Sequence, residues 1–469
     1  MAARSLRLIV RGVVAALGWL AIGAASGGAA SPATRVPRPY PADPFPSTYR
    51  PAPSTDVLIR GAVVLDGLGH RFDDEDLLLQ NGKVVALGKR LVAPTGAQVI
   101  DAQGRWVTPG IIDVHSHDGD FALPLTSDNT DTNESTDWNT ANVWAEHSVQ
   151  PMDPAFSRAL ASGVTALQVL PGSVNLFGGR GVVLKPISAV TMQAMKFPGA
   201  PYSLKMACGE NPKFFYGGKG RFPATRMGNV AGYREAWLAA RRYKADWDKY
   251  ERSGGEPPKR DLKLDTLVGV LDGDIRVHMH CYKADEMAVV LDVAKEMGYR
   301  VAAFHHATDA YKIPVLLRQS GACVAVWADW WGFKVEAEDG IPENAALLDA
   351  AGVCVMMHSD SPAIGQHLNL EAGKAAAAGR RAGLDIPPER AIRWVTSNPA
   401  KALGLADRVG ALEPGKNADV VIWSANPLSV YSHADQVFID GALLYDRSRP
   451  AAGPSSDFEL GRAVSEVPQ

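Results

Sequence analysis

Two histidines two positions apart, His115 and His117, follow the short apolar run 111–114. This run is rich in β-branched residues and comes directly after a Pro-Gly pair, which is typical of a buried strand. Side chains alternate between the faces of a strand, so residues i and i+2 point the same way. The pair therefore offers two imidazoles from one strand end, an arrangement that suits a divalent metal ion but needs further ligands.

Further candidate ligands occur where later strand-like runs end. Seven of the 11 histidines lie at or just after such ends, and one carboxylate follows the last of them. Neutral imidazole and carboxylate together suit zinc or a similar divalent ion. The candidates in chain order are His115, His117, Lys205, His278, His280, His305, His306, His358 and Asp360.

Strand-like and helix-like segments alternate through the middle of the chain, residues 111–408. Eight strands alternating with helices favour an α/β fold, a (β/α)8 TIM-like barrel, in which function lies at the carboxyl ends of the strands. No clear helix separates the second run from the third, so a doubly wound open sheet is the alternative. The eight apolar runs begin at Ile111, Thr165, Gly181, Ser203, Ile275, Val301, Ala322 and Val353.

Short strands with hairpin turns flank this middle part on both sides. The dipeptide Asn81-Gly82 separates two apolar runs near the start, and Asp440-Gly441 does so near the end. Both dipeptides favour hairpins because the turn positions need a positive φ. Residues 56–110 and 409–450 are therefore expected to form one small β-sandwich from both chain ends, followed by a flexible tail at 451–469.

Composition and the N-terminal residues indicate an exported protein. The chain has 469 residues, is 46% hydrophobic and 21% charged, and its formal net charge of −3 offers no basic patch for nucleic acid. Residues 1–30 combine a basic start, a short apolar run and a small-residue exit, which indicates a secretory signal peptide, with an uncleaved anchor as the alternative. Residues 31–55 are rich in Pro, Ala and Ser and are expected to be a linker. We predict a secreted or periplasmic protein with no stable membrane span after signal removal.

The four cysteines, Cys208, Cys281, Cys323 and Cys354, all lie in apolar strand-like runs. An exported protein could pair them as disulfides. A buried thiol is the commoner state for a cysteine in such a run, however. We therefore expect no structural disulfide.

Longer motifs resemble the signatures of the amidohydrolase superfamily. Residues 109–117 resemble its first-strand signature, and residues 396–404 and 410–419 resemble its C-terminal signature. The resemblance covers about residues 56–445. Within the superfamily, residues 209–213, 225–228 and 280–286 resemble the imidazolonepropionase-like group. This group includes metal-dependent dipeptidases.

The resemblance implies a role for several candidate ligands. His115 and His117 match the family's first-strand metal ligands, and His306 matches the sixth-strand ligand. Asp360 matches the eighth-strand aspartate, which is expected to act both as ligand and as general base. A barrel core with a small β-sandwich made from both chain ends is also implied.

For two of the implied ligand positions, the sequence offers alternative residues. His280 matches the fifth-strand ligand, but His278 competes because it lies two residues back on the same face. For the bridging ligand, Lys205 resembles the carboxylated lysine of many members, and Glu210 resembles the glutamate of others. One or two ions, most simply Zn²⁺, are therefore expected.

This ligand set predicts metal-assisted hydrolysis of an amide C–N bond. A bound ion lowers the pKa of its water from about 15.7 toward about 7. Asp360 would accept the proton and pass it to the leaving nitrogen, with His280 or His305 helping to polarise the carbonyl. We expect a peptide-like or N-acyl amino acid substrate. The alternatives are a cyclic-amide hydrolase or a heterocycle deaminase, and, least expected, a non-catalytic binding protein on the same fold.

Substrate contacts are indicated only weakly by the sequence. Three tryptophans after the seventh run could wall an apolar or aromatic substrate group, or they could pack their own loop. Cationic and phenolic side chains could hold a substrate carboxylate, or they could be structural. The partner expected is a small molecule or short peptide, and homo-oligomer formation is left open. The candidates are Arg226, Tyr282, Lys283, Trp327, Trp330, Trp331 and His358.

Overall fold

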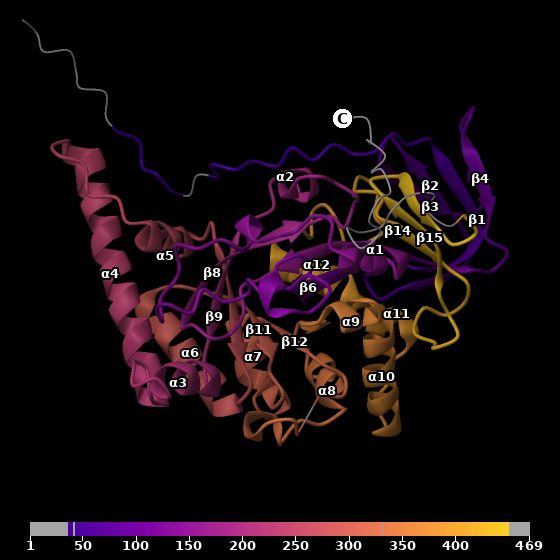
Figure 1. The fold of residues 1–469 in the computed structure, drawn as a ribbon. Helices are drawn as coiled ribbons and strands as arrows, with labels where there is room; N and C mark the ends of the chain where they lie inside the picture. The colour runs from indigo at the N-terminus through magenta and orange to yellow at the C-terminus, as the bar shows by residue number, and fades with distance from the viewer. Residues whose placement is uncertain (1–35, 41–42, 331, 450–469) are drawn as a thin grey trace, which may run out of the picture. The chain divides into compact units, whose positions relative to one another are not determined.

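A barrel-like sheet of eight strands forms the centre of the protein. The computed structural model describes residues 36–40, 43–330 and 332–449, and those described residues that follow Pro37 belong to one compact unit. The sheet order is β13-β12-β11-β10-β9-β8-β7-β6. Strands β6, β8, β9, β11 and β12 are labelled in Figure 1. The strands are β6 (Ile111–Ser116), β7 (Val164–Val169), β8 (Phe177–Leu184), β9 (Ser203–Ala207), β10 (Arg276–Cys281), β11 (Val301–His306), β12 (Cys323–Val326) and β13 (Val355–Met357).

The two edges of this sheet approach each other and nearly close it. Beyond β13, the backbone N–H of Asp360 donates to the carbonyl of His115 on β6 over 2.9 Å. The hydroxyl of Ser359 donates to the same carbonyl over 3.1 Å. The predicted eight strands are thus confirmed, and the nearly closed sheet is a TIM-like barrel, so the doubly wound alternative is wrong.

One strand departs from the regular parallel barrel. Strand β8 runs antiparallel to both of its neighbours, β7 and β9. Only residues 170–176 connect β7 to β8, and a parallel crossover needs a dozen or more residues. The sequence shows no helix between the second and third runs because this connection is short. The short connection makes β8 antiparallel to its neighbours, and the barrel still nearly closes.

Helices follow most of the later strands and lie outside the sheet (Figure 1). Helix α5 begins where the Asp261 side chain accepts hydrogen bonds from two backbone N–H groups, and α6 ends at Gly298 in the left-handed conformation. None of the described helices is both long and apolar enough to cross a membrane. The longer helices are α1 (Pro154–Ala161), α3 (Glu210–Gly217), α4 (Arg226–Ser253), α5 (Leu262–Asp272), α6 (Ala284–Met297), α7 (Pro314–Ser320), α8 (Asn344–Ala350), α10 (Leu368–Arg381) and α12 (Ser397–Leu403).

Strands from both chain ends join in a second sheet. Its order is β16-β15-β14-β5-β1-β2-β3, with β4 paired to β1. The antiparallel pair β5 and β14 links the two ends, with Val107 opposite Ile422. A two-layered sandwich stays a prediction, because the described strands hydrogen-bond as one sheet. They are β1 (Val57–Leu65), β2 (Arg71–Gln80), β3 (Lys83–Gly88), β4 (Gln98–Asp101), β5 (Trp106–Pro109), β14 (Val420–Trp423), β15 (Ala434–Ile439) and β16 (Ala442–Asp446).

A buried ion cluster ties the barrel to this second sheet. The Lys185 ammonium, just after β8, lies 2.8 Å from a carboxylate oxygen of Asp440 and 3.4 Å from one of Asp419. Burial raises the pKa of Asp419 to about 6, because the Lys185 charge only partly offsets the desolvation. The described part of the predicted linker also contacts this region, where the Tyr49 hydroxyl donates to Asp440 over 2.6 Å. The predicted signal peptide and C-terminal tail lie outside the described residues.

The expectation of free buried thiols is wrong. The four cysteines form two disulfides, Cys208–Cys281 and Cys323–Cys354. Residue 207 pairs with 280 between β9 and β10, and residue 324 pairs with 355 between β12 and β13. Each cysteine therefore lies beside its partner on the neighbouring strand. The sequence indicates that these residues are buried, but not which strands are neighbours or in what register.

We expect the denatured but unreduced protein to react with no thiol reagent, and the reduced protein to expose all four thiols. Replacing Cys323 and Cys354 together by Ala should lower the free energy of unfolding by about 2–4 kcal/mol, because the cross-link restricts the unfolded chain. Thiol titration and urea unfolding measure both effects. Four reactive thiols before reduction would contradict the pairing.

Candidate metal centre

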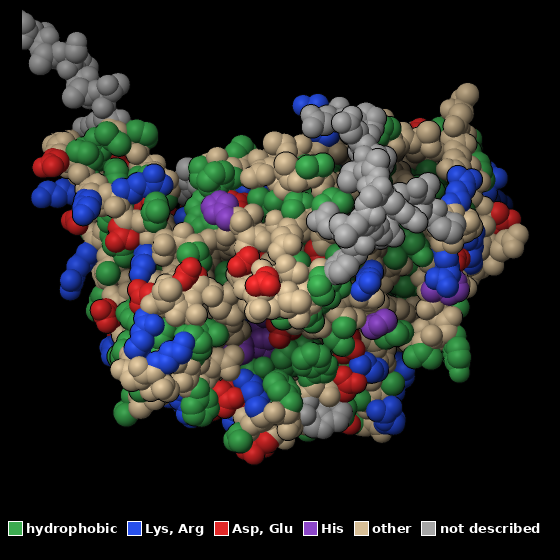
Figure 2. Space-filling view, in the orientation of Figure 1, with side chains coloured by type: hydrophobic (Ala, Val, Ile, Leu, Met, Phe, Trp, Pro, Cys, Tyr) green, Lys and Arg blue, Asp and Glu red, His purple; other side chains and the backbone are tan. Residues whose placement is uncertain are grey.

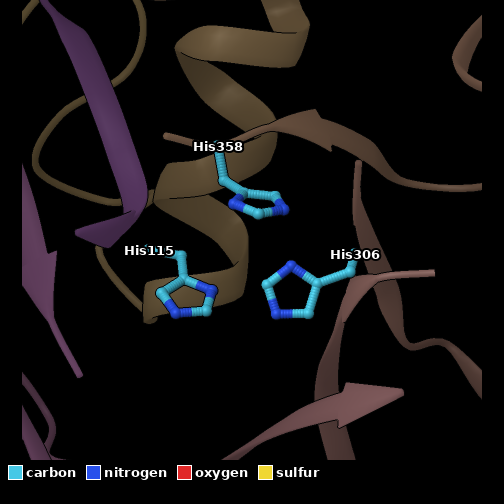
Figure 3. A group of neighbouring side chains, drawn as sticks. All are labelled: His115, His306 and His358. Atoms are coloured by element: carbon cyan, nitrogen blue, oxygen red, sulfur yellow. The ribbon is translucent and has the colours of Figure 1, made fainter. Parts of the chain in front are cut away.

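Side chains from the ends of three strands converge in one group. The imidazoles of His115, His306 and His358 each offer a nitrogen within 4.8 Å of the others (Figure 3). The ligand atoms of His115, His117 and Asp360 meet the same limit. His115 is therefore common to both groups, and the five side chains form one cluster.

The barrel positions this cluster by placing strand ends side by side. His115 is within β6 and His117 follows it; His306 ends β11, and His358 and Asp360 follow β13. Both His306 and Asp360 have a positive φ, 72° and 53°, in a region that few non-glycine residues adopt. These turns redirect the chain just where its side chains must face the cluster.

The nitrogens of this cluster fit a metal ion. Both ring nitrogens of His280 and of His358, and Nδ1 of His306, are buried without a hydrogen-bond partner. An unpartnered buried polar atom is costly, so such atoms are rare in native proteins. A neutral imidazole has a lone pair on one of its two nitrogens, and a bound cation would accept that lone pair from each ring that reaches it. Imidazole and carboxylate together are a donor set for a divalent ion of the zinc type.

Burial keeps most of these imidazoles neutral, as metal ligation requires. It lowers the pKa of His358 to about 3 and those of His115, His280 and His306 well below their usual value. His117 differs: burial lowers its pKa, but interactions with Asp120 and Asp360 outweigh this.

Interactions with Asp120 and Asp360 raise the pKa of His117 to about 9 in the absence of a cation. Its Nε2 lies 3.1 Å from Oδ1 of Asp360. Desolvation tends to raise the pKa of Asp360, but His117 holds it below its usual range. The carboxylate of Asp360 is thus kept ionised in the cluster.

Lys205 and Glu210, the alternative bridging ligands, lie in different surroundings. The Lys205 ammonium is fully buried, 3.2 Å from Nε2 of His115 and 2.9 Å from the carbonyl oxygen of Pro171. Burial lowers its pKa to about 8. Glu210, at the start of α3, instead forms an ion pair with Lys334 at 3.3 Å. The structure brings Lys205 into contact with the cluster and leaves Glu210 in a separate ion pair.

The two histidines of β10 also differ in their neighbours. The ring of His280 lies 4.6 Å from that of His306, measured between centroids. Nδ1 of His278 instead lies 3.1 Å from the amide nitrogen Nε2 of Gln168 and 2.9 Å from the ring nitrogen Nε2 of His305. His305 in turn lies 3.1 Å from His115, between their Nδ1 atoms. The hydrogen bonds of His278 and His305 therefore lead to His115 and not to His306.

Aromatic side chains border the cluster on one side. The ring of Trp327 stacks on that of His306 at 4.4 Å, and Trp330 stacks on Trp327 at 4.8 Å. Tyr282 also stacks on His306, at 5.1 Å. Trp331 lies outside the described residues. The loop tryptophans therefore both pack on each other and wall the histidine cluster.

The cationic substrate candidates are already paired with acidic side chains. Arg226 bonds to Glu286 and lies 3.6 Å from Glu336, and Lys283 lies 3.1 Å from Asp339. Their charges are thus compensated within the protein. Basic and acidic side chains are likewise mixed over the face in Figure 2.

Sequence reasoning missed several polar residues around the cluster. Asp113 accepts hydrogen bonds from the backbone N–H groups of His115 and Ser359, at 3.1 Å and 3.2 Å. Asp120 is buried, with Oδ1 3.6 Å from Nδ1 of His117. Both aspartates flank the first histidine pair in sequence, which is a signal that could have found them. Nothing in the sequence pointed to Gln168.

Known proteins are similar to this chain in sequence, and a solved structure is similar to it in fold. The model of the amidohydrolase family matches residues 270–444. The crystal structure of an amidohydrolase from Thermotoga maritima MSB8 is 35% identical, with a TM-score of 0.76, and the match covers 83% of this chain and 100% of that one.

Two curated relatives match over most of this chain. Amidohydrolase tasK of Hapsidospora irregularis is 33% identical over 421 residues, which are 83% of this chain but 42% of that protein, so the chain spans less than half of its length. A 5-methylthioadenosine/S-adenosylhomocysteine deaminase of Desulforudis audaxviator is 25% identical over 79% of this chain and 85% of the relative. Together with the barrel, these matches show that the chain belongs to the amidohydrolase family, whose members are hydrolases acting on carbon–nitrogen bonds.

Proposed function

We propose that this protein is an exported, metal-dependent amidohydrolase that cleaves an amide C–N bond in a peptide-like or N-acyl amino acid substrate. The observation that carries this proposal is the convergence of the ligand atoms of His115, His117 and Asp360 within 4.8 Å, with His306 and His358 in the adjoining group. These side chains meet at the strand ends of a barrel, where such folds place their active sites.

We infer that the metal would be held by His115, His117, His306 and Asp360, with His280 or Lys205 completing the set. Their donor atoms suit Zn²⁺. When bound, the ion supplies Lewis acidity, which lowers the pKa of water toward about 7 and polarises a carbonyl group. Carboxylation of the buried Lys205 amine would add oxygen donors and allow two ions.

Asp360 would serve as the proton carrier. Its ionised carboxylate can accept a proton from the attacking water and then donate it to the leaving nitrogen. The interaction of its Oδ1 with Nε2 of His117 at 3.1 Å would hold it in place. His280, whose ring faces that of His306, is better placed than His305 to contact a substrate carbonyl. Trp327 and Tyr282 would exclude water from that side.

The two disulfides support export. Disulfides persist in oxidising compartments and are rare in the cytosol. The described residues contain no free cysteine, and the basic and apolar residues 1–30 are the proposed signal. Periplasmic or secreted location is therefore part of the proposal.

A deaminase acting on a heterocycle is the second candidate, because a relative named as a deaminase matches over most of both chains. Release of ammonia from an amino-heterocycle, compared with release of an amino acid from dipeptides and N-acyl amino acids, separates the two.

Chelator-treated protein should take up added Zn²⁺ and become more stable. An ion at 100 times its dissociation constant stabilises a protein by about 2.7 kcal/mol. His306→Asn should lose most of this gain, whereas the control His433→Asn, at a site remote from the cluster in sequence and partly exposed, should keep it. Metal analysis and thermal unfolding measure the effect. Equal uptake by wild type and His306→Asn would contradict the ligand set.

Asp360→Asn should keep the fold but lose the proton carrier. We expect kcat to fall by about 10²- to 10⁴-fold, which is typical for loss of a general acid–base group. The control Asp407→Asn, whose side chain is 77% exposed, should behave like wild type. Circular dichroism verifies folding. Near-normal turnover by Asp360→Asn would rule out its proposed role.

Lys205→Gln and Glu210→Gln distinguish the two bridging ligands. If Lys205 bridges, its variant should bind fewer ions per chain and lose activity by orders of magnitude, while the Glu210 variant changes little. Metal content and turnover are measured on both proteins. The reverse result would assign the bridge to Glu210.

A further inference from the structure

Two buried histidines have no part in the proposed reaction. His278 and His305 are both fully buried and lie behind His115. Nδ1 of His278 is 2.9 Å from Nε2 of His305, and Nδ1 of His305 is 3.1 Å from Nδ1 of His115. The three rings therefore form a continuous hydrogen-bonded chain that ends at a candidate metal ligand.

The other end of this chain is a side-chain amide of known orientation. Gln168 on β7 places its Nε2 atom 2.8 Å from the carbonyl oxygen of Val114 and 3.1 Å from Nδ1 of His278. A carbonyl can only accept, so the atom beside it must be the NH₂ group. One hydrogen of this group is used by Val114, and the second points to His278.

The direction of every following bond depends on this second hydrogen. If Nδ1 of His278 is an acceptor, Nε2 of His305 must carry a hydrogen and share that acceptor. A neutral ring then has its lone pair on the other nitrogen, so Nδ1 of His305 accepts from Nδ1–H of His115. The Nε2 atom of His115 is left without a hydrogen.

The opposite assignment reverses each bond. His278 would then carry its hydrogen on Nδ1, and the second N–H of Gln168 would face it without an acceptor. Buried donors without acceptors are rare because they are costly. The first assignment avoids this, and it is the one that offers a lone pair from Nε2 of His115.

We propose that Gln168, acting through His278 and His305, sets the tautomer of His115 and so prepares its Nε2 atom to bind the metal. All three are positioning residues, because none of them contacts the reacting atoms. The proposal rests on the metal role of His115 proposed above. Nε2 of His115 lies 3.2 Å from the Lys205 ammonium, which can donate to a lone pair at that position in the absence of metal. The same atom lies 3.2 Å from Oδ1 of Asp360, and a cation between the lone pair and this carboxylate oxygen would be stabilised by both.

The proposal also explains why two strands each carry two nearby histidines. We call the hydrogen-bonded chain of Gln168, His278, His305 and His115 the relay. On β10, His280 faces His306, whereas His278 belongs to the relay. On β11, His306 belongs to the cluster and His305 to the relay. One histidine of each pair would bind or contact the metal region, and the other would orient His115.

The wild-type protein, freed of metal and labelled with ¹⁵N-histidine, tests the relay directly. Two-dimensional ¹H–¹⁵N spectra that correlate ring carbon-bound protons with both nitrogens report each tautomer. We expect His115 to carry its hydrogen on Nδ1, and His305 and His278 to carry theirs on Nε2. His305 with its hydrogen on Nδ1, or any of the three as imidazolium at pH 7, would overturn the relay. Because no metal is present, this result does not depend on the proposed function.

A variant measures what the relay contributes to metal binding. Gln168→Leu removes the donor while roughly keeping the side-chain volume, and should weaken Zn²⁺ binding by about 10- to 100-fold, as loss of groups that orient a ligand does. Thr165→Val, on the same strand and also buried, is the matched control and should bind as wild type. Competition with a chromogenic chelator gives the affinities.

The same substitution in a His305→Phe protein shows whether the loss of affinity acts through the relay. In a His305→Phe protein the relay is already broken, so adding Gln168→Leu should cause no further loss of affinity. Unchanged affinity in Gln168→Leu alone, or an equal further loss in the His305→Phe background, would overturn the proposal. If wild type bound no metal at all, the proposed function would fail, while the tautomers of the metal-free protein would still decide the relay.

Discussion

Lone pairs of buried imidazoles are the constraint on which the rest of this structure depends. The barrel removes the rings of His280, His306 and His358 from water, and several of their nitrogens meet no donor. In a low-dielectric interior such atoms need a hydrogen bond or a cation. A protein that keeps them is therefore built around what they bind, and the nearly closed sheet supplies the rigid frame that brings them together.

The cluster has hydrogen-bonded polar side chains on one side and aromatic rings on the other. Behind it, hydrogen bonds run from Gln168 through His278 and His305 to His115, which restricts the orientation of the His115 ring. In front, the rings of Trp327 and Tyr282 stack on that of His306. The low dielectric of the interior strengthens the interaction between Asp360 and His117. It also favours the neutral state of His280, His306 and His358.

The sequence predicted much of this because local patterns carry it. Eight apolar runs, two hairpin dipeptides and histidines at strand ends are all visible without a structure, and each maps to an element or to the cluster. The errors came from contacts between distant segments. Free thiols were expected at Cys208 and Cys281, but strand register places these residues side by side. Strand β8 was counted correctly, but its reversed direction follows from a connection too short for a crossover.

By itself, the sequence determined which side chains could ligate a metal and that they would lie near strand ends, because alternation along a strand is a local property. It also determined the family, through motifs that are continuous in the chain. Only the tertiary structure showed how equivalent candidates differ in their neighbours. Lys205 contacts His115, whereas Glu210 pairs with Lys334. His280 faces His306, whereas His278 contacts Gln168 and His305. These differences depend on which strands are neighbours and how far each residue lies along the barrel, and those distances are set by packing over the whole domain rather than by any segment alone.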